Sequence, residues 1–249
     1  MSSIIFFDFE TTGLDILGNN ATDKIIQFMF LESESMEYYS SFVNPGKKIS
    51  PKTIKLNGIT SFDVERYKPF SFYLPKIIDF IGTETVYLVA HNGDSFDKPL
   101  LLQEMRKNGF PVPPNWFFID SLKLSRKFLT HLPNHKMDTL RKHFNLSHKN
   151  SHLATKDVCD LQSIYQKLVG DKTPDEIYTT CEEIKQYMSF GQYKNELIKD
   201  VPIEYLIWAL RNSVISPTKN CDTFEQLCNS RHEQIRYMTN HILNHSLKS

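Results

Sequence analysis

Short apolar runs alternate with amphipathic helical patterns over the first two thirds of the chain. Continuous β-prone runs predict buried strands at 3–9, 24–31, 85–90 and 116–119, and a half-exposed strand at 37–43. Helical spacing of apolar residues, with capping and turn residues, predicts helices at 50–56, 71–81, 96–107, 138–144 and 154–168. Three antiparallel-type strands followed by alternating helices and strands predict an α/β fold with a mixed central sheet flanked by helices.

The pattern changes near residue 170, so we expect a main domain at 1–170 and smaller elements after it. A connecting helix is predicted at 171–184, a small module at 185–212 and a largely helical tail at 213–249. The tail carries an apolar stripe at helical spacing, formed by Leu227, Ile235, Met238 and Ile242.

Composition excludes several classes of protein. The chain has 249 residues, of which 40% are hydrophobic and 23% charged, so it has enough apolar side chains for a core and is not a disordered polymer. No apolar run approaches the ~20 residues that span a bilayer, and no basic segment precedes Asp8 and Glu10, so we expect neither membrane association nor a signal peptide. Four cysteines are too few for a disulfide scaffold, which predicts a reducing, cytoplasmic location.

Basic residues are concentrated in one part of a chain whose net charge is zero. Residues 101–156 hold ten Lys and Arg against three Asp and Glu, and they include five of the nine histidines. Such a stretch is typical of solvated helix faces, and it also suits a phosphate backbone if it borders a nucleic-acid site. The charge pattern alone leaves both interpretations open.

Two acidic residues interrupt the first apolar strand. Asp8 and Glu10 are two positions apart, so both carboxylates point to the same face of that strand. Burying two like charges is costly unless a cation lies between them, and oxygen ligands suit Mg²⁺ or Mn²⁺. The alternative is that the strand ends at Phe7 and leaves both acids in solvent.

Two further segments carry acidic residues near predicted helix starts. His91-Asn92-Gly93-Asp94-Ser95-Phe96-Asp97 ends one strand and opens a helix, where α/β sheets collect ligands, although an Asp there is often only a cap. His152 precedes the helix that begins at Ala154, and Asp157 lies within it. A metal held by Asp157 would leave His152 in reach of a bound water, whereas a loop histidine is more often simply solvated.

Taken together, these segments resemble the three motifs of the DEDDh 3′→5′ exonucleases, the superfamily of the bacterial proofreading subunit, RNase T and oligoribonuclease. Asp8-Phe9-Glu10-Thr11-Thr12-Gly13 is similar to the first motif, His91 to Asp97 to the second, and His152 with Asp157 to the third. The resemblance covers about residues 4–168 in the family's motif order. It implies an RNase H-like exonuclease fold.

The resemblance also implies a role for each matched residue. Asp8, Glu10, Asp97 and Asp157 would hold two Mg²⁺ or Mn²⁺ ions, with Asp8 bridging them, and His152 would be the general base. Contacts to the terminal nucleotide would come from Thr11, Thr12, Leu14, Asn92 and Phe96. These residue types suit the chemistry, because two ions can acidify a water and offset charge on the phosphate, and a histidine titrates near neutrality.

The expected activity is hydrolysis of phosphodiester bonds from a 3′ end with release of 5′-mononucleotides. DNA is the favoured substrate, as a single strand or a 3′ end, and RNA trimming is the nearest alternative. A second alternative is a non-catalytic protein that binds nucleic acid or a polymerase. Expected partners are a polymerase or a repair protein, in replication or repair, and a second copy of the chain.

The C-terminal region has a resemblance of its own. Residues 185–212 resemble a small module found behind exonuclease X-like proteins, and their aromatic residues suit either nucleic-acid contact or a small core.

The tail also permits a zinc interpretation, although the cysteine spacing is not that of a standard knuckle. The candidate zinc ligands are Cys221, Cys228, His232, His241 and His245.

Overall fold

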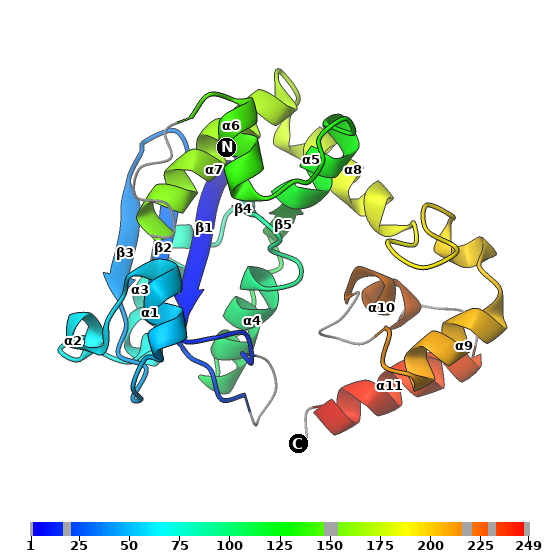
Figure 1. The fold of residues 1–249 in the computed structure, drawn as a ribbon, viewed down its shortest axis with the longest axis horizontal. Helices are drawn as coiled ribbons and strands as arrows, with labels where there is room; N and C mark the ends of the chain where they lie inside the picture. The colour runs from blue at the N-terminus through cyan, green and yellow to red at the C-terminus, as the bar shows by residue number, and fades with distance from the viewer. Residues whose placement is uncertain (1, 17–20, 147–153, 216–220, 229–232, 247–249) are drawn as a thin grey trace. The chain divides into compact units, whose positions relative to one another are not determined.

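The computed structural model describes residues 2–16, 21–146, 154–215, 221–228 and 233–246. The chain divides into two compact units, of which the first comprises residues 1–16 and 21–178 and the second includes residues 179–249. Figure 1 shows the elements of each unit. No described helix is both long and apolar enough to cross a membrane.

A five-stranded mixed sheet forms the centre of the first unit. Its order is β3-β2-β1-β4-β5, with β1 paired antiparallel to β2 and parallel to β4. The remaining pairs are antiparallel β2–β3 and parallel β4–β5. The strands are β1 (Ser3–Thr11), β2 (Ile25–Glu32), β3 (Tyr38–Phe42), β4 (Val86–Ala90) and β5 (Trp116–Asp120). The predicted α/β fold with a mixed sheet is confirmed.

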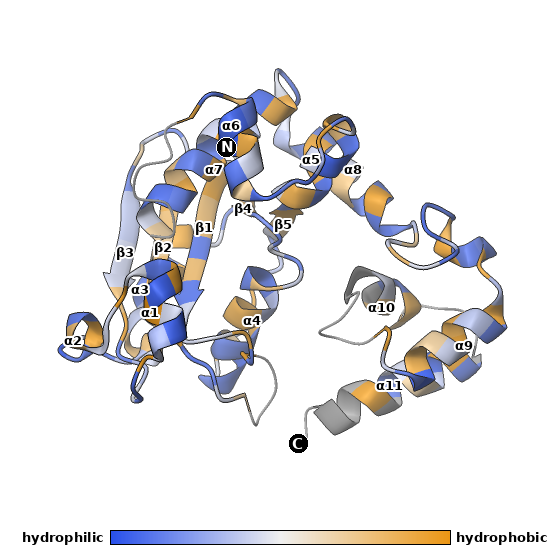
Figure 2. Ribbon diagram, viewed as in Figure 1, coloured by the Kyte–Doolittle hydropathy of each residue, from blue (hydrophilic) through white to orange (hydrophobic). Residues whose placement is uncertain are grey.

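Strand β1 continues two residues beyond its predicted end. Its pairing with β2 extends through Glu10 opposite Gln27, so Asp8 and Glu10 both lie inside a paired strand. The alternative in which the strand ends at Phe7 is therefore wrong. The hydrophobic residues of β1 and β2 stand out in Figure 2, while β3 at the edge is paler.

Helices cover both faces of the sheet. On one face α7 packs against β1 and β2, with the ring of Tyr165 5.4 Å from that of Phe6. On the other face α3 places Phe70 5.7 Å from Phe9. The helices of this unit are α1 (Pro51–Asn57), α2 (Ser61–Val64), α3 (Phe70–Ile81), α4 (Asp97–Lys107), α5 (Ser121–Phe128), α6 (Met137–His143) and α7 (Ala154–Val169).

Two helices, α2 and α5, were not expected from the apolar pattern. Helix α5 follows β5 with no loop between them, because Asp120 ends the strand and also caps the helix by accepting the Leu122 N–H at 2.9 Å. Helix α2 has only four residues and depends on a capping box between Thr60 and Asp63. Both helices are too short for periodicity to reveal them.

The second unit is held by one hydrophobic cluster. Helix α8 (Pro174–Lys185) crosses the boundary between the units, and the 3₁₀ turn Ile198–Asp200, α9 (Ile203–Arg211), α10 (Cys221–Cys228) and α11 (Glu233–Ser246) follow. The buried residues of this hydrophobic cluster include Met188, Leu206, Leu210, Phe224, Leu227 and Ile235. The segments 185–212 and 213–249 therefore share a core, since apolar side chains of both are buried in the same cluster.

Candidate active site

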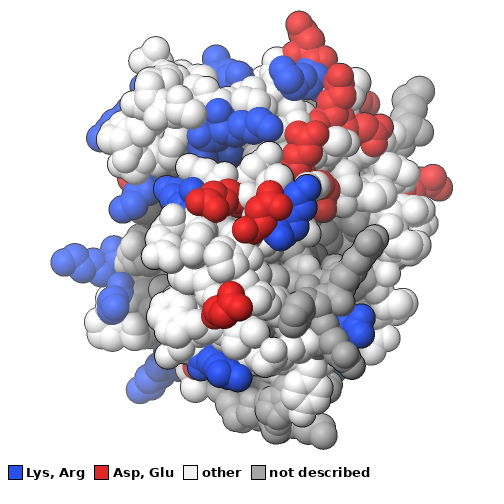
Figure 3. Space-filling view, turned by 90° about the vertical axis from the view of Figure 1, so that its right-hand side faces the viewer, with Lys and Arg blue, Asp and Glu red and all other residues white. Residues whose placement is uncertain are grey.

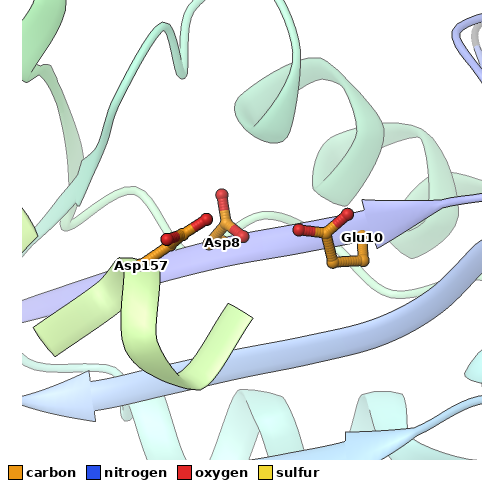
Figure 4. A group of neighbouring side chains, drawn as sticks. All are labelled: Asp8, Glu10 and Asp157. Carbon is orange, nitrogen blue, oxygen red and sulfur yellow. The ribbon is translucent and has the colours of Figure 1, made fainter. Parts of the chain in front are cut away.

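The acidic residues of β1 meet an acidic residue of α7. One carboxylate oxygen from each of Asp8, Glu10 and Asp157 lies within 4.8 Å of the others. Figure 4 shows the three side chains converging beside β1, with Asp157 projecting from its helix. Residues separated by about 150 positions in the sequence thus form one cluster of oxygens.

Strand pairing and a side-chain bond place the start of α7 beside this cluster. Gln27 on β2 lies opposite Glu10, and its Oε1 accepts the N–H of Ala154 at 3.2 Å. That bond satisfies one of the N–H groups left free at the start of a helix. Asp157 lies in the first turn of the same helix, so Gln27 fixes the position from which its carboxylate projects.

A buried arginine joins α6 to α7 beside the cluster. Arg141 is 1% exposed and forms ion pairs with three carboxylates. Its Nε lies 2.7 Å from Asp160 Oδ2, its Nη1 lies 2.9 Å from Asp138 Oδ1, and its Nη2 contacts Asp157. This arginine therefore helps to fix the orientation of the Asp157 carboxylate.

Asp97 approaches the cluster from the start of α4. Its side chain is 2% exposed, and its Oδ1 accepts the N–H of Phe9 at 3.1 Å. Because Phe9 lies between Asp8 and Glu10, this bond fixes Asp97 against the same segment of β1. Asp97 is not one of the three residues whose oxygens lie within 4.8 Å, but its charge acts directly on Asp8.

Burial and mutual repulsion raise the pKa values of these carboxyl groups. Burial raises the pKa of Asp8 well above its usual value, and the charges of Asp97, Glu10 and Asp157 raise it further. Burial is also the main cause that raises the pKa of Glu10 to about 7 and that of Asp97 to about 8, against the lowering effects of their hydrogen bonds. Without a cation, the site thus disfavours its fully ionised form.

A divalent cation fits this arrangement of donors. The residues supply carboxylate oxygens, the preferred ligands of Mg²⁺ and Mn²⁺, and Glu10, Asp97 and Asp157 are each orientated by a bond from a neighbouring group. Asn57 Nδ2 donates to Glu10 Oε2 at 3.3 Å, Phe9 N–H donates to Asp97, and Arg141 contacts Asp157. Such bonds orientate ligands in metal sites.

The residues predicted to contact the terminal nucleotide lie at the end of β1 and in the segments that follow β1 and β4. Thr11 and Thr12 are buried, and Leu14 is 85% exposed. Asn92 is exposed and has a left-handed backbone with φ 65°, whereas Phe96 is half-buried just before α4. His152, the predicted base, lies outside the described residues.

An aspartate network holds the loop after β1. Asp23 accepts the Thr12 hydroxyl at 2.7 Å and the Asp15 N–H at 3.0 Å, and Lys47 Nζ lies 3.2 Å from it. These contacts bracket Leu14 on both sides. They hold the backbone on both sides of the exposed leucine.

The chain matches a family defined by nucleases. A family model described as "Exonuclease" matches residues 5–165. The chain belongs to this exonuclease family. The predicted resemblance to the DEDDh superfamily is thereby confirmed, and family membership implies a hydrolytic nuclease that depends on divalent metal.

Curated relatives of this chain include polymerases and an organellar nuclease. It is 30% identical over 188 residues to DNA polymerase III PolC-type of Listeria welshimeri, a match that covers 74% of this chain and 12% of the relative. It is 28% identical over 185 residues to exonuclease DPD1, chloroplastic/mitochondrial, of Arabidopsis thaliana, covering 68% of this chain and 57% of the relative. The chain thus spans about an eighth of the polymerase relative.

Solved structures share the fold of this chain. Exonuclease X in complex with 5′ overhanging duplex DNA aligns with a TM-score of 0.55 and 21% identity, covering 71% of this chain and 98% of that one. The zinc-bound E. coli ExoI–ssDNA complex aligns with a TM-score of 0.62 and 18% identity, covering 75% of this chain and 44% of that one.

A second family model, named for a quorum-sensing-regulated virulence factor, matches residues 179–230.

Several residues of the site carried no signal that the sequence analysis used. Arg141 lies in a basic stretch that predicted only charge, yet it is buried among carboxylates. Gln27 is a polar residue inside an apolar strand, and this position could have indicated that its side chain has a specific hydrogen-bond partner. Asn57 follows the helix predicted at 50–56 and begins a segment, 57–60, that also resembles one common in the family, but its bond to Glu10 was not predicted. For the zinc interpretation, the side chains of Cys221, His232, His241 and His245 lie outside the described residues.

A histidine beside the site is held in its neutral form. His91 Nδ1 lies 2.9 Å from Ser121 Oγ and its Nε2 lies 2.9 Å from the carbonyl oxygen of His135. Burial, with the charges of Arg126 and Arg141, lowers the pKa of His91 from 6.5 to about 4, although the bond to His135 opposes this shift. Protonation of His91 therefore disfavours the folded state.

Stability is expected to fall when His91 becomes protonated. Between pH 6.5 and about 4 the unfolded state binds the proton and the folded state does not, so the free energy of unfolding decreases as pH falls. The full effect is about 3 kcal/mol. Urea unfolding in EDTA at about pH 7 and about pH 5 should show a steeper loss for the wild type than for His91→Asn. Equal losses in the two proteins would refute this role of His91.

Proposed function

We propose that the chain is a two-metal 3′→5′ exonuclease that hydrolyses phosphodiester bonds at DNA 3′ ends and releases 5′-mononucleotides. The observation that carries the proposal is the meeting of the Asp8, Glu10 and Asp157 oxygens within 4.8 Å, with Asp97 bound to the backbone between the first two. Binding alone does not account for buried acids, because they repel the phosphates of a nucleic acid.

Each acidic residue has a separate part in this proposal. Asp8, Glu10 and Asp157 would hold one divalent ion, and Asp97 would hold a second, with Asp8 between the two. Bound ions of this kind lower the pKa of the attacking water and offset the negative charge that develops on the phosphate. His152 would accept the proton of that water as general base.

The remaining residues of the site hold the strand end and the ligands. Thr11, Thr12 and the exposed Leu14 would contact the terminal nucleotide from the loop after β1, and Asn92 and Phe96 from the loop after β4. Asn57 and Arg141 hold Glu10 and Asp157 through hydrogen bonds and ion pairs. Orientating several ligands beforehand lowers the cost of assembling the reactive complex.

The choice of DNA rests on the named relatives. The similar structures are complexes of exonucleases with duplex or single-stranded DNA, and the curated relatives include DNA polymerases. The polymerase relatives suggest a polymerase as the partner, and a repair protein stays a prediction from the sequence. Co-purification with a DNA polymerase, and the molar mass in solution, test the partner and the homodimer.

Matched oligonucleotides test the proposed function. Single-stranded DNA, duplex DNA and RNA of one sequence, labelled at the 5′ end, are incubated with Mg²⁺, Mn²⁺ or EDTA. We expect DNA to shorten in single-nucleotide steps with either metal, and to stay intact in EDTA or when the 3′ end is blocked by a phosphorothioate linkage. Faster shortening of RNA would replace DNA by RNA as the substrate, and internal cuts or activity in EDTA would contradict the mechanism.

A further inference from the structure

A cavity of the first unit lies beside the carboxylate cluster without containing any of its residues. It has a volume of about 660 Å³, and it is lined by residues of α5, of the loop before α6 and of the segment after β4. We call it the basic pocket. The lining residues that bear on its chemistry are His91, Asn92, Arg126, Asn134, His135 and Lys136.

The basic pocket lies at the same edge of the sheet as the acidic residues. Strands β1 and β4 are parallel neighbours with Phe6 opposite Val89, so Asp8 and His91 each lie two residues further along. On the far side of β4, Ala90 lies opposite Asp120, after which α5 begins. The charge of Arg141 acts on both Asp8 and His91, which is consistent with a short separation.

The basic pocket is lined by positive charge and by no carboxylate. Arg126 and Lys136 are both exposed, and neither pairs with a carboxylate of the described residues. The charge of Arg126 lowers the pKa values of both His91 and His135, so the guanidinium lies near the two rings. Two unneutralised cations on the wall of a cavity favour an anionic ligand.

An unpartnered ring nitrogen and an exposed asparagine complete the lining. The ring of His91 holds the loop before α6 by its bond to the His135 carbonyl. His135 Nδ1 is shielded from solvent and has no hydrogen-bond partner among the described residues. Asn92 is exposed at the rim, and its backbone N–H is fixed on Asp120 Oδ1 at 2.9 Å. A buried polar atom without a partner is costly, so a ligand that reaches it gains affinity.

We propose that the basic pocket binds the phosphate backbone of the substrate strand upstream of its 3′-terminal nucleotide. Arg126 and Lys136 contact phosphates there, and the apolar lining residues Leu122 and Met137 contact sugar or base. This inference rests on the proposed function, because the strand must lie with its 3′ end at Asp8. The volume of the basic pocket is in the range of small-ligand sites, enough for part of a strand.

Direct binding measurements test the proposal without requiring catalysis. Fluorescence anisotropy of a labelled single-stranded DNA in EDTA compares the wild type with Arg126→Gln/Lys136→Gln. We expect the double variant to bind about five- to tenfold more weakly, with a salt dependence of log K that is shallower by about 1.4 for two phosphate contacts. The loss should be larger for a long oligonucleotide than for a dinucleotide without a 5′-phosphate, which has no phosphate upstream of the scissile one.

Two matched variants separate charge from folding. Lys76→Gln/Lys167→Gln removes two exposed lysines from α3 and α7 and should bind like the wild type. Arg126→Lys/Lys136→Arg keeps both charges and should restore most of the affinity. Equal affinity and equal salt dependence in the wild type and the Gln double variant would overturn the proposal. Absence of DNA shortening by the wild type would instead overturn the proposed function, whatever the binding result.

Discussion

Asp8→Asn is expected to reduce the release of nucleotides from a DNA 3′ end by at least about 10³-fold, the size of loss found when a group that stabilises transition-state charge is removed. The substitution preserves the shape of the side chain but removes its charge, and Asp8 is the acid whose pKa responds to all three other carboxylates. Initial rates on a labelled single-stranded DNA with saturating Mg²⁺ provide the measurement.

The same variant is expected to be more stable than the wild type when no metal is bound. Burial and the charges of Asp97, Glu10 and Asp157 raise the pKa of Asp8, so its ionised form destabilises the folded chain at neutral pH. Thermal unfolding in EDTA should therefore give a higher Tm for Asp8→Asn, while added Mg²⁺ or Mn²⁺ should raise the Tm of the wild type more than that of the variant.

Asp79→Asn is the matched control for both readouts. Asp79 is exposed on α3, so neither activity nor Tm should change beyond a small surface effect. Activity of Asp8→Asn within a few-fold of the wild type would show that the cluster on β1 is not the reactive centre. A lower Tm in EDTA would show that the carboxylate is stabilised in the metal-free fold.

Arg141→Met is expected to lower the free energy of unfolding by about 3 kcal/mol, because it removes the buried cation between three carboxylates and leaves only Lys156 to pair with Asp160. Arg141 is 1% exposed and pairs with Asp138, Asp157 and Asp160 across α6 and α7. Of these partners Asp160 is itself buried, so solvent compensates little for the loss. Urea unfolding at neutral pH measures the effect.

Lys142→Met on the neighbouring, exposed position of α6 serves as the control and should change stability by less than about 0.5 kcal/mol. Nuclease activity should also decrease in Arg141→Met at temperatures where the variant is folded, since Asp157 loses the contact that orientates it. Similar unfolding free energies for the two variants would show that the arginine does not join α6 to α7.

The sequence predicts the acidic cluster because the two-residue period of a strand places acidic side chains, the type that binds divalent metals, on one face. Asp8 and Glu10 alternate with large aromatic residues on one strand, so their common face follows from strand geometry. Asp157 follows from the start of a long amphipathic helix, and the motif order joins it to the strand. The fold is predictable for the same reason, since four strands of the sheet are distinct apolar runs and the fifth, β3, has the pattern of a half-exposed strand.

The supporting contacts are not predictable from local pattern. Gln27, Asn57 and Arg141 act through partners that are far away in the sequence, and only the packing of α6 and α7 beside the sheet shows which partners they have. The shared core of the second unit was also not predictable from local pattern. Leu206 and Ile235 lie on separate helices, and nothing in the apolar stripe of either helix shows that both are buried in the same cluster. The sequence pattern predicts which face of a helix or strand is apolar, but only the packed structure shows which other element that face contacts.

The basic residues at 101–156 have different surroundings in the structure, so the charge of this stretch did not by itself predict one role. Figure 3 shows Lys and Arg as well as Asp and Glu on one face of the molecule, as expected for a chain of zero net charge. Of the basic residues in 101–156, Arg141 is buried in ion pairs, whereas Arg126 and Lys136 line a cavity. The same residue type thus has structural and ligand-binding roles within a few positions.

Anomalous diffraction from crystals grown with Mn²⁺ and a non-hydrolysable single-stranded DNA tests the central claim most directly. We predict an anomalous peak within about 2.0–2.3 Å of oxygens of Asp8, Glu10 and Asp157, with a second peak beside Asp8 on the Asp97 side. A map with no peak at these carboxylates, or with manganese bound only elsewhere on the chain, would contradict a metal-dependent nuclease centre on β1.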